Sequence, residues 1–256
     1  MLSFADDLGV LGKNQRDLEH NMNVLNRELI KRGMMINSKK TKSMVISRED
    51  KQHTIRLNDD ILEQVNSYKY LGVMIESNCS LKEEITQRIG KATKVYAQLG
   101  QSFISKRELT TKTKMSIFNA IYCPTLIYGC ESWTLDNRDK SRLQATEMKF
   151  LRRSVGKTKR DKVRNVNIRE KVKTDSLEVK IERNQLRWFG HLNRMNENRI
   201  PKQIFDCKQQ SKLPRGRPRK MWIETIAENV EKRGCKLSDA KKRCSDRDRW
   251  RKFVQN

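Results

Sequence analysis

Two adjacent carboxylates near the start of the chain are the residues best suited to chemistry. Asp6 and Asp7 lie in the run Phe4-Ala5-Asp6-Asp7, with apolar residues on both sides. This pattern predicts two short strands joined by a tight turn that carries both acids. Neighbouring carboxylates repel each other unless a cation compensates them, and a pair of Mg2+ ions about 4 Å apart does so in phosphoryl-transfer sites. The alternative is a solvated hairpin without a metal.

The elements around these acids predict an α+β front segment. A helix is expected over residues 15–32, where apolar residues form one stripe and Gly33 follows as a C-cap. Short strands are expected at residues 34–37, 42–47, 54–57 and 68–75. Asn58-Asp59-Asp60 predicts a hairpin turn.

The rest of the chain is expected to be helical. Pro124 should end the second of these helices, Asp175 and Glu178 resemble a capping box, and Pro218 suits a first helical turn that leads to a helix ending at Gly234. The expected helices cover residues 81–99, 108–122, 138–155, 175–189, 218–234 and 238–253.

Positive charge gathers in the second part of the chain. The 256 residues hold 56 Lys and Arg against 31 Asp and Glu, a net charge of +25. Residues 1–100 hold 16 basic and 13 acidic residues, which leaves 40 and 18 for residues 101–256. Such an excess indicates a large anionic partner, either nucleic acid or an acidic membrane face.

Two basic runs are candidates for nucleic-acid binding. The first has a single acid, Asp161, and eight basic residues: Lys149, Arg152, Arg153, Lys157, Lys159, Arg160, Lys162 and Arg164. Phosphates attract such a run without reading sequence, although a solvated helix face is the alternative. The second is Arg215-Gly216-Arg217-Pro218-Arg219-Lys220, which contains the core of an AT-hook for narrow minor grooves. Its alternative is a basic linker.

Several classes of protein are disfavoured by composition. Six cysteines occur without a CxxC pair and with only three histidines, so reduced and mostly buried thiols are expected rather than a zinc site. No apolar run approaches the roughly 20 residues of a membrane span. The acidic start does not fit a secretory signal, so an intracellular protein, nuclear or cytoplasmic and not secreted, is expected.

The order of three motifs resembles the later motifs of reverse transcriptases. The Asp-Asp hairpin is similar to the catalytic hairpin, and Gly33 with Asn37, Lys40 and Thr41 resembles the following lysine motif. Tyr70-Leu71-Gly72 resembles the hairpin that grips the primer end. Three further stretches resemble the C-terminal parts of non-LTR (LINE-type) retrotransposon polyproteins, which join an endonuclease to a reverse transcriptase. These stretches are residues 120–133, 187–195 and 215–222. The chain looks like the C-terminal part of such a polyprotein.

The resemblance implies a fold and a set of roles. A partial palm of short antiparallel strands plus a helix would cover residues 1–78, a helical thumb residues 79–135, and a basic helical region residues 136–256. Asp6 and Asp7 would bind Mg2+. Lys40 would neutralise the leaving pyrophosphate, with Lys39 and Lys42 as competing candidates. Tyr70, Leu71 and Gly72 would contact the primer.

The implied activity is RNA-directed DNA synthesis, with RNA and DNA as partners. The family places a further catalytic Asp on a strand that precedes the Asp-Asp hairpin, and this sequence shows no such strand. A truncated remnant, catalytically incomplete alone but still able to bind nucleic acid, is therefore expected. The alternatives are a domesticated nucleic-acid-binding adaptor, an unselected reading frame, and an active enzyme completed by another chain. The unpaired palm sheet near residues 34–46 should favour self-association.

Overall fold

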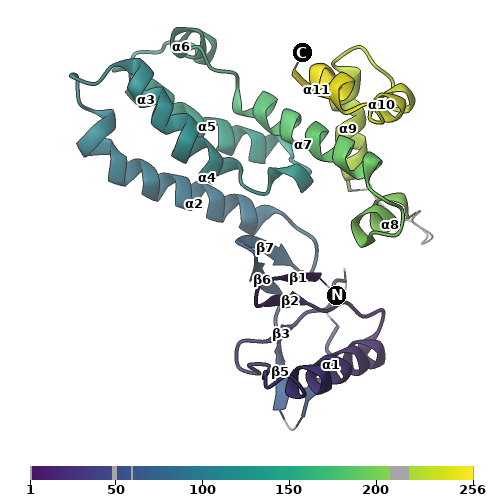
Figure 1. Ribbon diagram of the computed structural model, residues 1–256. Coiled ribbons are helices and arrows are strands. Elements are labelled where there is room, and N and C mark those ends of the chain that lie inside the picture. The colour runs from purple at the N-terminus through teal and green to yellow at the C-terminus, as the bar shows by residue number, and fades with distance from the viewer. Residues whose placement is uncertain (1, 48–50, 59, 208–218, 256) are drawn as a thin grey trace. The chain divides into compact units, whose positions relative to one another are not determined.

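The computed structural model of the protein describes residues 2–47, 51–58, 60–207 and 219–255 (Figure 1). The chain forms two compact units, Met1–Glu84 and Ile85–Asn256. The first unit mixes short strands with one helix, and the second is helical, as the α+β prediction required. The predicted palm over residues 1–78, thumb over residues 79–135 and basic C-terminal region over residues 136–256 stay predictions.

The first unit contains three small sheets and a helix. The strand pairs are antiparallel, as expected, except that β3 runs parallel to β5. The chain reverses from β3 into β4 and again into β5, so β3 and β5 point the same way. The elements are β1 Leu2–Phe4, β2 Asp7–Gly9, α1 Gln15–Ile30, β3 Lys42–Ser43, β4 Ile55–Leu57, β5 Asp60–Gln64, β6 Ser67–Tyr70 and β7 Val73–Glu76.

Helix α1 covers the β4–β5 hairpin and confirms the predicted amphipathic helix. Its buried Met22 packs with Ile55, Leu57 and Leu62 in the core of this unit. The helix begins at Asn14, whose side chain accepts a hydrogen bond from the Asp17 N–H. It is followed by Gly33 with φ +71, the left-handed conformation expected at a C-cap.

Three of the predicted strands differ in the structure. Residues 34–37 form no strand, because Asn37 begins a turn in which its carbonyl and side chain accept the Lys40 N–H. The strand expected at residues 42–47 is reduced to β3. The stretch expected as one strand at residues 68–75 is a hairpin, with Leu71 and Gly72 at φ 47 and 82 in a two-residue turn.

The second unit is built from helices and short helical turns. Helix α2 begins in the first unit, where the Glu84 carboxylate accepts the Met74 N–H of β7. The elements are α2 Lys82–Leu99, α3 Thr111–Ile117, α4 Cys123–Ile127, α5 Asn137–Ser154, α6 Asn165–Val172, α7 Leu177–Arg194, α8 Ile200–Asp206, α9 Trp222–Glu231, α10 Leu237–Arg243 and α11 Arg247–Gln255, with π-helical turns at Gly100–Ile104 and Phe118–Tyr122 and a 3-10 turn at Cys130–Ser132.

Three predicted helix boundaries were wrong. The helix expected to stop near Pro124 continues into α4, because the wide π-helical turn before it accommodates a residue without an N–H. Helix α7 is capped by Ser176 instead of Asp175, and Val179 occupies the position where a capping box needs an acid. The helix expected over residues 238–253 breaks at Asp246, whose side chain caps α11. Pro218 lies outside the described residues.

The core of the second unit is aromatic. Phe118 and Tyr122 of the π-helical turn contact Phe150 of α5 and each other, with ring centroids 4.8–5.8 Å apart. A separate cluster holds Phe189 of α7 and Trp250 of α11, whose ring centroids lie 5.8 Å apart. All six cysteines are free, and four of them are buried, which confirms the thiol prediction. Among the described residues, no helix is both long and apolar enough to cross a membrane.

Candidate nucleic-acid interface

The Asp-Asp hairpin has the geometry that the sequence predicted. Phe4 of β1 pairs with Asp7 of β2, so Asp6 lies in the two-residue turn together with Ala5. Ala5 adopts φ 51, a left-handed conformation that closes the turn. Both carboxylates are exposed at the tip of the hairpin. No group of three or more His, Cys, Asp or Glu residues that could hold a metal occurs among the described residues.

The structure brings the Tyr70-Leu71-Gly72 hairpin next to the Asp-Asp hairpin. A Cβ atom placed on Gly9 of β2 would lie 3.6 Å from the Tyr70 hydroxyl oxygen. The Tyr70 ring therefore stands beside the strand that begins with Asp7. Two motifs separated by more than 60 residues in the sequence are thus neighbours in space, and Figure 1 shows the two hairpins side by side.

The three lysines near position 40 have different environments. Lys42 forms an ion pair with Glu63 across β3 and β5, with Nζ and Oε2 2.5 Å apart. Lys39 and Lys40 are exposed. No hydrogen bond or ion pair joins Lys40 to Asp6 or Asp7 among the described residues. Lys42 is thus the least available of the three candidates.

Half of the first basic run is engaged within the protein. The Arg152 guanidinium donates to the Val163 carbonyl at 2.8 Å and to Asn165 Oδ1 at 2.6 Å, which holds the loop between α5 and α6 against α5. Arg153 donates to Ser105, Lys157 pairs with Asp161, and Lys149 lies 4.7 Å from the centre of the Tyr96 ring. Arg152 in particular has a structural role that the sequence did not reveal.

The other half of this run is exposed on the loop between α5 and α6. We name it the α5–α6 basic loop, and it consists of Lys159, Arg160, Lys162 and Arg164. The Asp161 carboxylate turns back to accept the backbone N–H and the hydroxyl of Thr158. These hydrogen bonds and the ammonium of Lys157 lower the pKa of Asp161 to about 2. The one acid of the loop is therefore already bound within the protein.

The second basic run is only partly described. Arg215 and Arg217 lie outside the described residues, and Arg219 is exposed. Lys220 forms an ion pair with Glu228 of α9.

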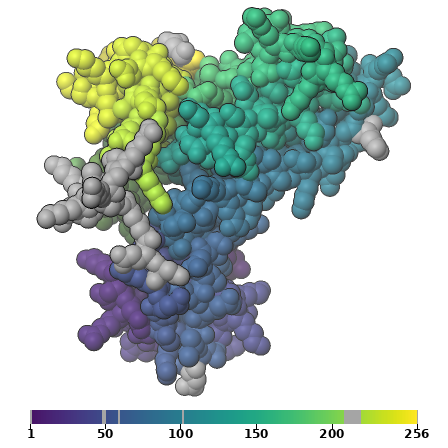
Figure 2. Space-filling view, turned by 180° about the vertical axis from the view of Figure 1, so that it is seen from behind, coloured from purple at the N-terminus to yellow at the C-terminus, as the bar shows by residue number. Residues whose placement is uncertain are grey.

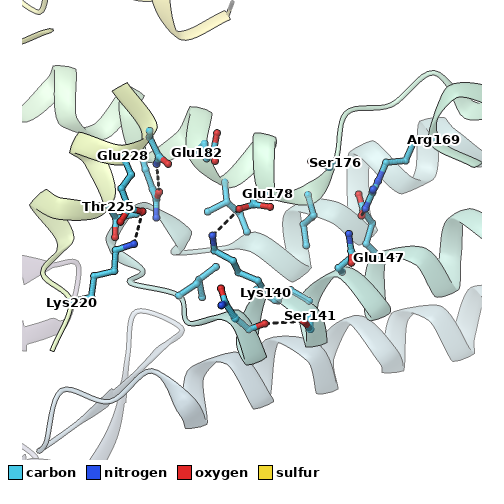
Figure 3. A pocket seen from close by; sticks show the side chains of 18 residues that line it. Lys140, Ser141, Glu147, Arg169, Ser176, Glu178, Glu182, Lys220, Thr225 and Glu228 are labelled. Atoms are coloured by element: carbon cyan, nitrogen blue, oxygen red, sulfur yellow. Dashed lines mark hydrogen bonds and ion pairs between the residues drawn. The ribbon is translucent and has the colours of Figure 1, made fainter. Parts of the chain in front are cut away.

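A polar cavity of about 450 Å³ between α5, α6, α7 and α9 was not predicted (Figure 3). Its charged residues pair with one another: Lys140 with Glu178 and Arg169 with Glu147, at 2.8 and 2.6 Å. Glu147 is fully buried, and this burial raises its pKa, whereas the Arg169 hydrogen bond opposes the change. We assign these pairs to the architecture of the helices. The sequence signal for this cavity is the pair of acids at positions 178 and 182, which lie one helical turn apart.

The sequence of this chain is similar to those of known proteins. Residues 1–75 match the family described as reverse transcriptase (RNA-dependent DNA polymerase). A putative uncharacterized transposon-derived protein of Caenorhabditis elegans is 26% identical over 91% of this chain and 85% of its own length. No solved structure matches the chain.

Two longer relatives are named as polymerases of mobile elements. A probable RNA-directed DNA polymerase from transposon X-element of Drosophila melanogaster is 27% identical over 61% of this chain. The RNA-directed DNA polymerase from mobile element jockey of Drosophila funebris is 20% identical over 85% of this chain. The matches span 17% and 24% of these two proteins, respectively.

Proposed function

Because residues 1–75 are a reverse transcriptase region of the non-LTR retrotransposon type, we propose that this chain contributes the catalytic hairpin and the primer-contacting hairpin of an RNA-directed DNA polymerase. The observation that carries the proposal is the placement of Tyr70 beside the strand that begins with Asp7. A primer end held at Tyr70-Leu71-Gly72 would lie close to metal ions held by Asp6 and Asp7. Lys40 is the proposed partner of the leaving pyrophosphate.

The 256-residue polypeptide is proposed to be a remnant that is catalytically incomplete by itself. Two Mg2+ ions between an attacking and a leaving oxygen need ligands from more than one side. Asp6 and Asp7 are adjacent and exposed, Asp6 in the two-residue turn and Asp7 at the start of β2, so both come from one hairpin. Weak Mg2+ binding without catalytic geometry is the expected property of that pair.

Primer extension tests the catalytic part of the proposal. The purified chain, supplied with Mg2+, deoxynucleotides and a primed RNA template, should add no nucleotides. Extension that disappears in Asp6→Asn would show a competent site and would overturn the proposal of incompleteness. Extension that appears only when a second chain supplies further palm strands would instead support completion in trans, while the assigned roles of Asp6 and Asp7 would stand.

The chain is further proposed to bind the backbone of RNA and DNA through the α5–α6 basic loop. Four exposed cations follow one another on a short loop whose only acid is bound internally. This arrangement attracts phosphates without reading sequence. Direct binding of a labelled primer–template duplex tests the proposal, and absence of saturable binding at low salt would refute it. A domesticated adaptor would show the same binding without polymerase activity, and its site of action, nucleus or cytoplasm, stays a prediction.

Self-association is proposed for the first unit. Met35 is 91% exposed and Ile46 56% exposed, and Leu8 and Leu11 line an apolar groove beside α1. Exposed apolar surface of this kind favours association between copies. Light scattering should show a mass above that of the monomer, and Met35→Lys with Ile46→Lys should reduce it. A monodisperse monomer at high protein concentration would refute the proposal.

A further inference from the structure

A further group of cations lies on the last two helices, outside the basic runs at residues 149–164 and 215–220. Between residues 236 and 252 there are eight basic and three acidic residues. The basic residues are all exposed: Lys236, Lys241, Lys242, Arg243, Arg247, Arg249, Arg251 and Lys252. We call this group the α10–α11 basic face. Figure 2 shows these helices, in yellow, at the surface of the molecule.

The packing of α11 explains why its cations point outward together. Trp250, Phe253 and Val254 are buried against the core, so the cations of α11 occupy the remaining positions around the helix, all of which are exposed. The Arg243 guanidinium lies 5.5 Å from the centre of the Phe253 ring, which places the last turn of α10 beside α11. Arg194 of α7 donates to the Cys244 carbonyl at 2.8 Å and holds the connection between the two helices. The cations of α10 and α11 therefore form one surface.

Asp246, which lies between α10 and α11, is hydrogen-bonded to the backbone. Asp246 accepts the N–H groups of Arg249 and Asp248, and these bonds contribute to a lowered pKa of its carboxyl group. It also pairs with Arg249 at 3.2 Å. Within the described part of the chain, no ion pair to an acid is found for Lys241, Lys242, Arg247 or Arg251. The face keeps several cations close together, which costs folding free energy unless an anion is bound.

This face is separate from the α5–α6 basic loop. Helix α11 runs antiparallel along α7, because Arg183 donates to the Gln255 carbonyl and Trp250 donates to the Leu186 carbonyl. The connection at Cys244 therefore meets the end of α7 at Arg194. The α5–α6 basic loop instead follows Ser154 at the end of α5, and no hydrogen bond or ion pair joins it to α10 or α11 among the described residues. The two groups of cations therefore lie on different segments, and removal of one group leaves the contacts of the other in place.

We propose that the α10–α11 basic face is a second binding surface for the phosphodiester backbone of RNA or DNA. The inference rests on the proposed nucleic-acid binding and adds a distinct site to it. Phosphate contacts fix the position of a nucleic acid and carry no sequence information, so this surface binds any sequence. In the sequence, the signal within α11 is the spacing of Arg247 and Arg251 by four residues, which places both on one side of that helix.

Neutralisation of this face tests the proposal. The variant Lys242→Gln, Arg247→Gln, Arg251→Gln removes three charges from it, and the variant Lys13→Gln, Arg16→Gln, Arg56→Gln removes three exposed charges from the first unit as a matched control. Binding of labelled duplex DNA and of labelled RNA is measured by fluorescence anisotropy over a range of salt concentrations. Loss of three phosphate contacts should weaken binding at least about 10-fold at 0.1 M salt and lower the salt slope by about 2 to 3. The control should retain the slope of the parent chain.

The outcomes separate this inference from the proposed function. Parent-like binding by the α10–α11 variant would overturn the inference, while the α5–α6 basic loop would remain in place. Failure of the parent chain to bind would refute both. Anionic phosphatidylserine vesicles are the third ligand, and an effect of the variant on vesicles alone would assign the face to membranes and overturn the inference. If circular dichroism shows misfolding, Arg249→Gln with Lys252→Gln makes the same test on other residues.

Discussion

Raising the salt concentration from 50 to 200 mM should weaken the binding of this protein to a primer–template duplex by about 1,000-fold. Each cation that neutralises a phosphate releases a counterion, and the logarithm of the binding constant falls in proportion to the number of such contacts. The α5–α6 basic loop offers four exposed cations and the α10–α11 basic face eight. About six simultaneous contacts are sufficient for the stated loss.

The same titration on variants locates the contacts. The variant Lys159→Gln, Arg160→Gln, Arg164→Gln removes three cations of the α5–α6 basic loop without touching Arg152, which holds that loop in place. Its salt slope should be smaller than that of the parent chain by about 2 to 3. The control with Lys13, Arg16 and Arg56 replaced should keep the parent slope. Binding that does not depend on salt would contradict the electrostatic mechanism altogether.

Replacement of Gly190 by alanine should destabilise the second unit by about 3 kcal/mol, at the upper end of the usual cost of overpacking. A Cβ atom at this position would lie 2.1 Å from Nε1 and 2.3 Å from Cδ1 of Trp250. The indole cannot move away easily, because it is 2% exposed and donates to the Leu186 carbonyl at 2.9 Å. Helices α7 and α11 would have to separate to admit the new methyl group.

Urea unfolding followed by circular dichroism measures this effect. Gly90→Ala is the matched control, since Gly90 lies within helix α2 and nothing lies within 4 Å of its added Cβ. Because alanine is the better helix former, the control should stabilise the protein by about 1 kcal/mol. The two identical substitutions therefore have opposite expected signs. Equal effects would show that the close contact of Gly190 with Trp250 does not exist in solution.

The sequence by itself determined the elements whose signals are local. The signals for the apolar stripe of α1, for its cap at Gly33 and for the hairpin that carries Asp6 and Asp7 come from residues close to one another along the chain, and the structure confirms these elements. The order of the motifs also indicated the reverse transcriptase family, which the comparisons bear out for residues 1–75. Pro124 does not stop its helix, because a wider helical turn upstream removes the conflict that its ring would otherwise cause.

Only the tertiary structure decided which charged residues are available. Arg152 and Arg160 are equivalent as sequence letters, but Arg152 is bound to the Val163 carbonyl whereas Arg160 is exposed. It also placed Tyr70 beside β2 and joined the cations of α10 and α11 into one face. A local sequence pattern specifies a helix or a turn, because the hydrogen bonds of these elements join residues that are near neighbours in the chain. Contacts between distant segments depend on how whole elements pack, and therefore cannot be predicted from any short stretch of sequence.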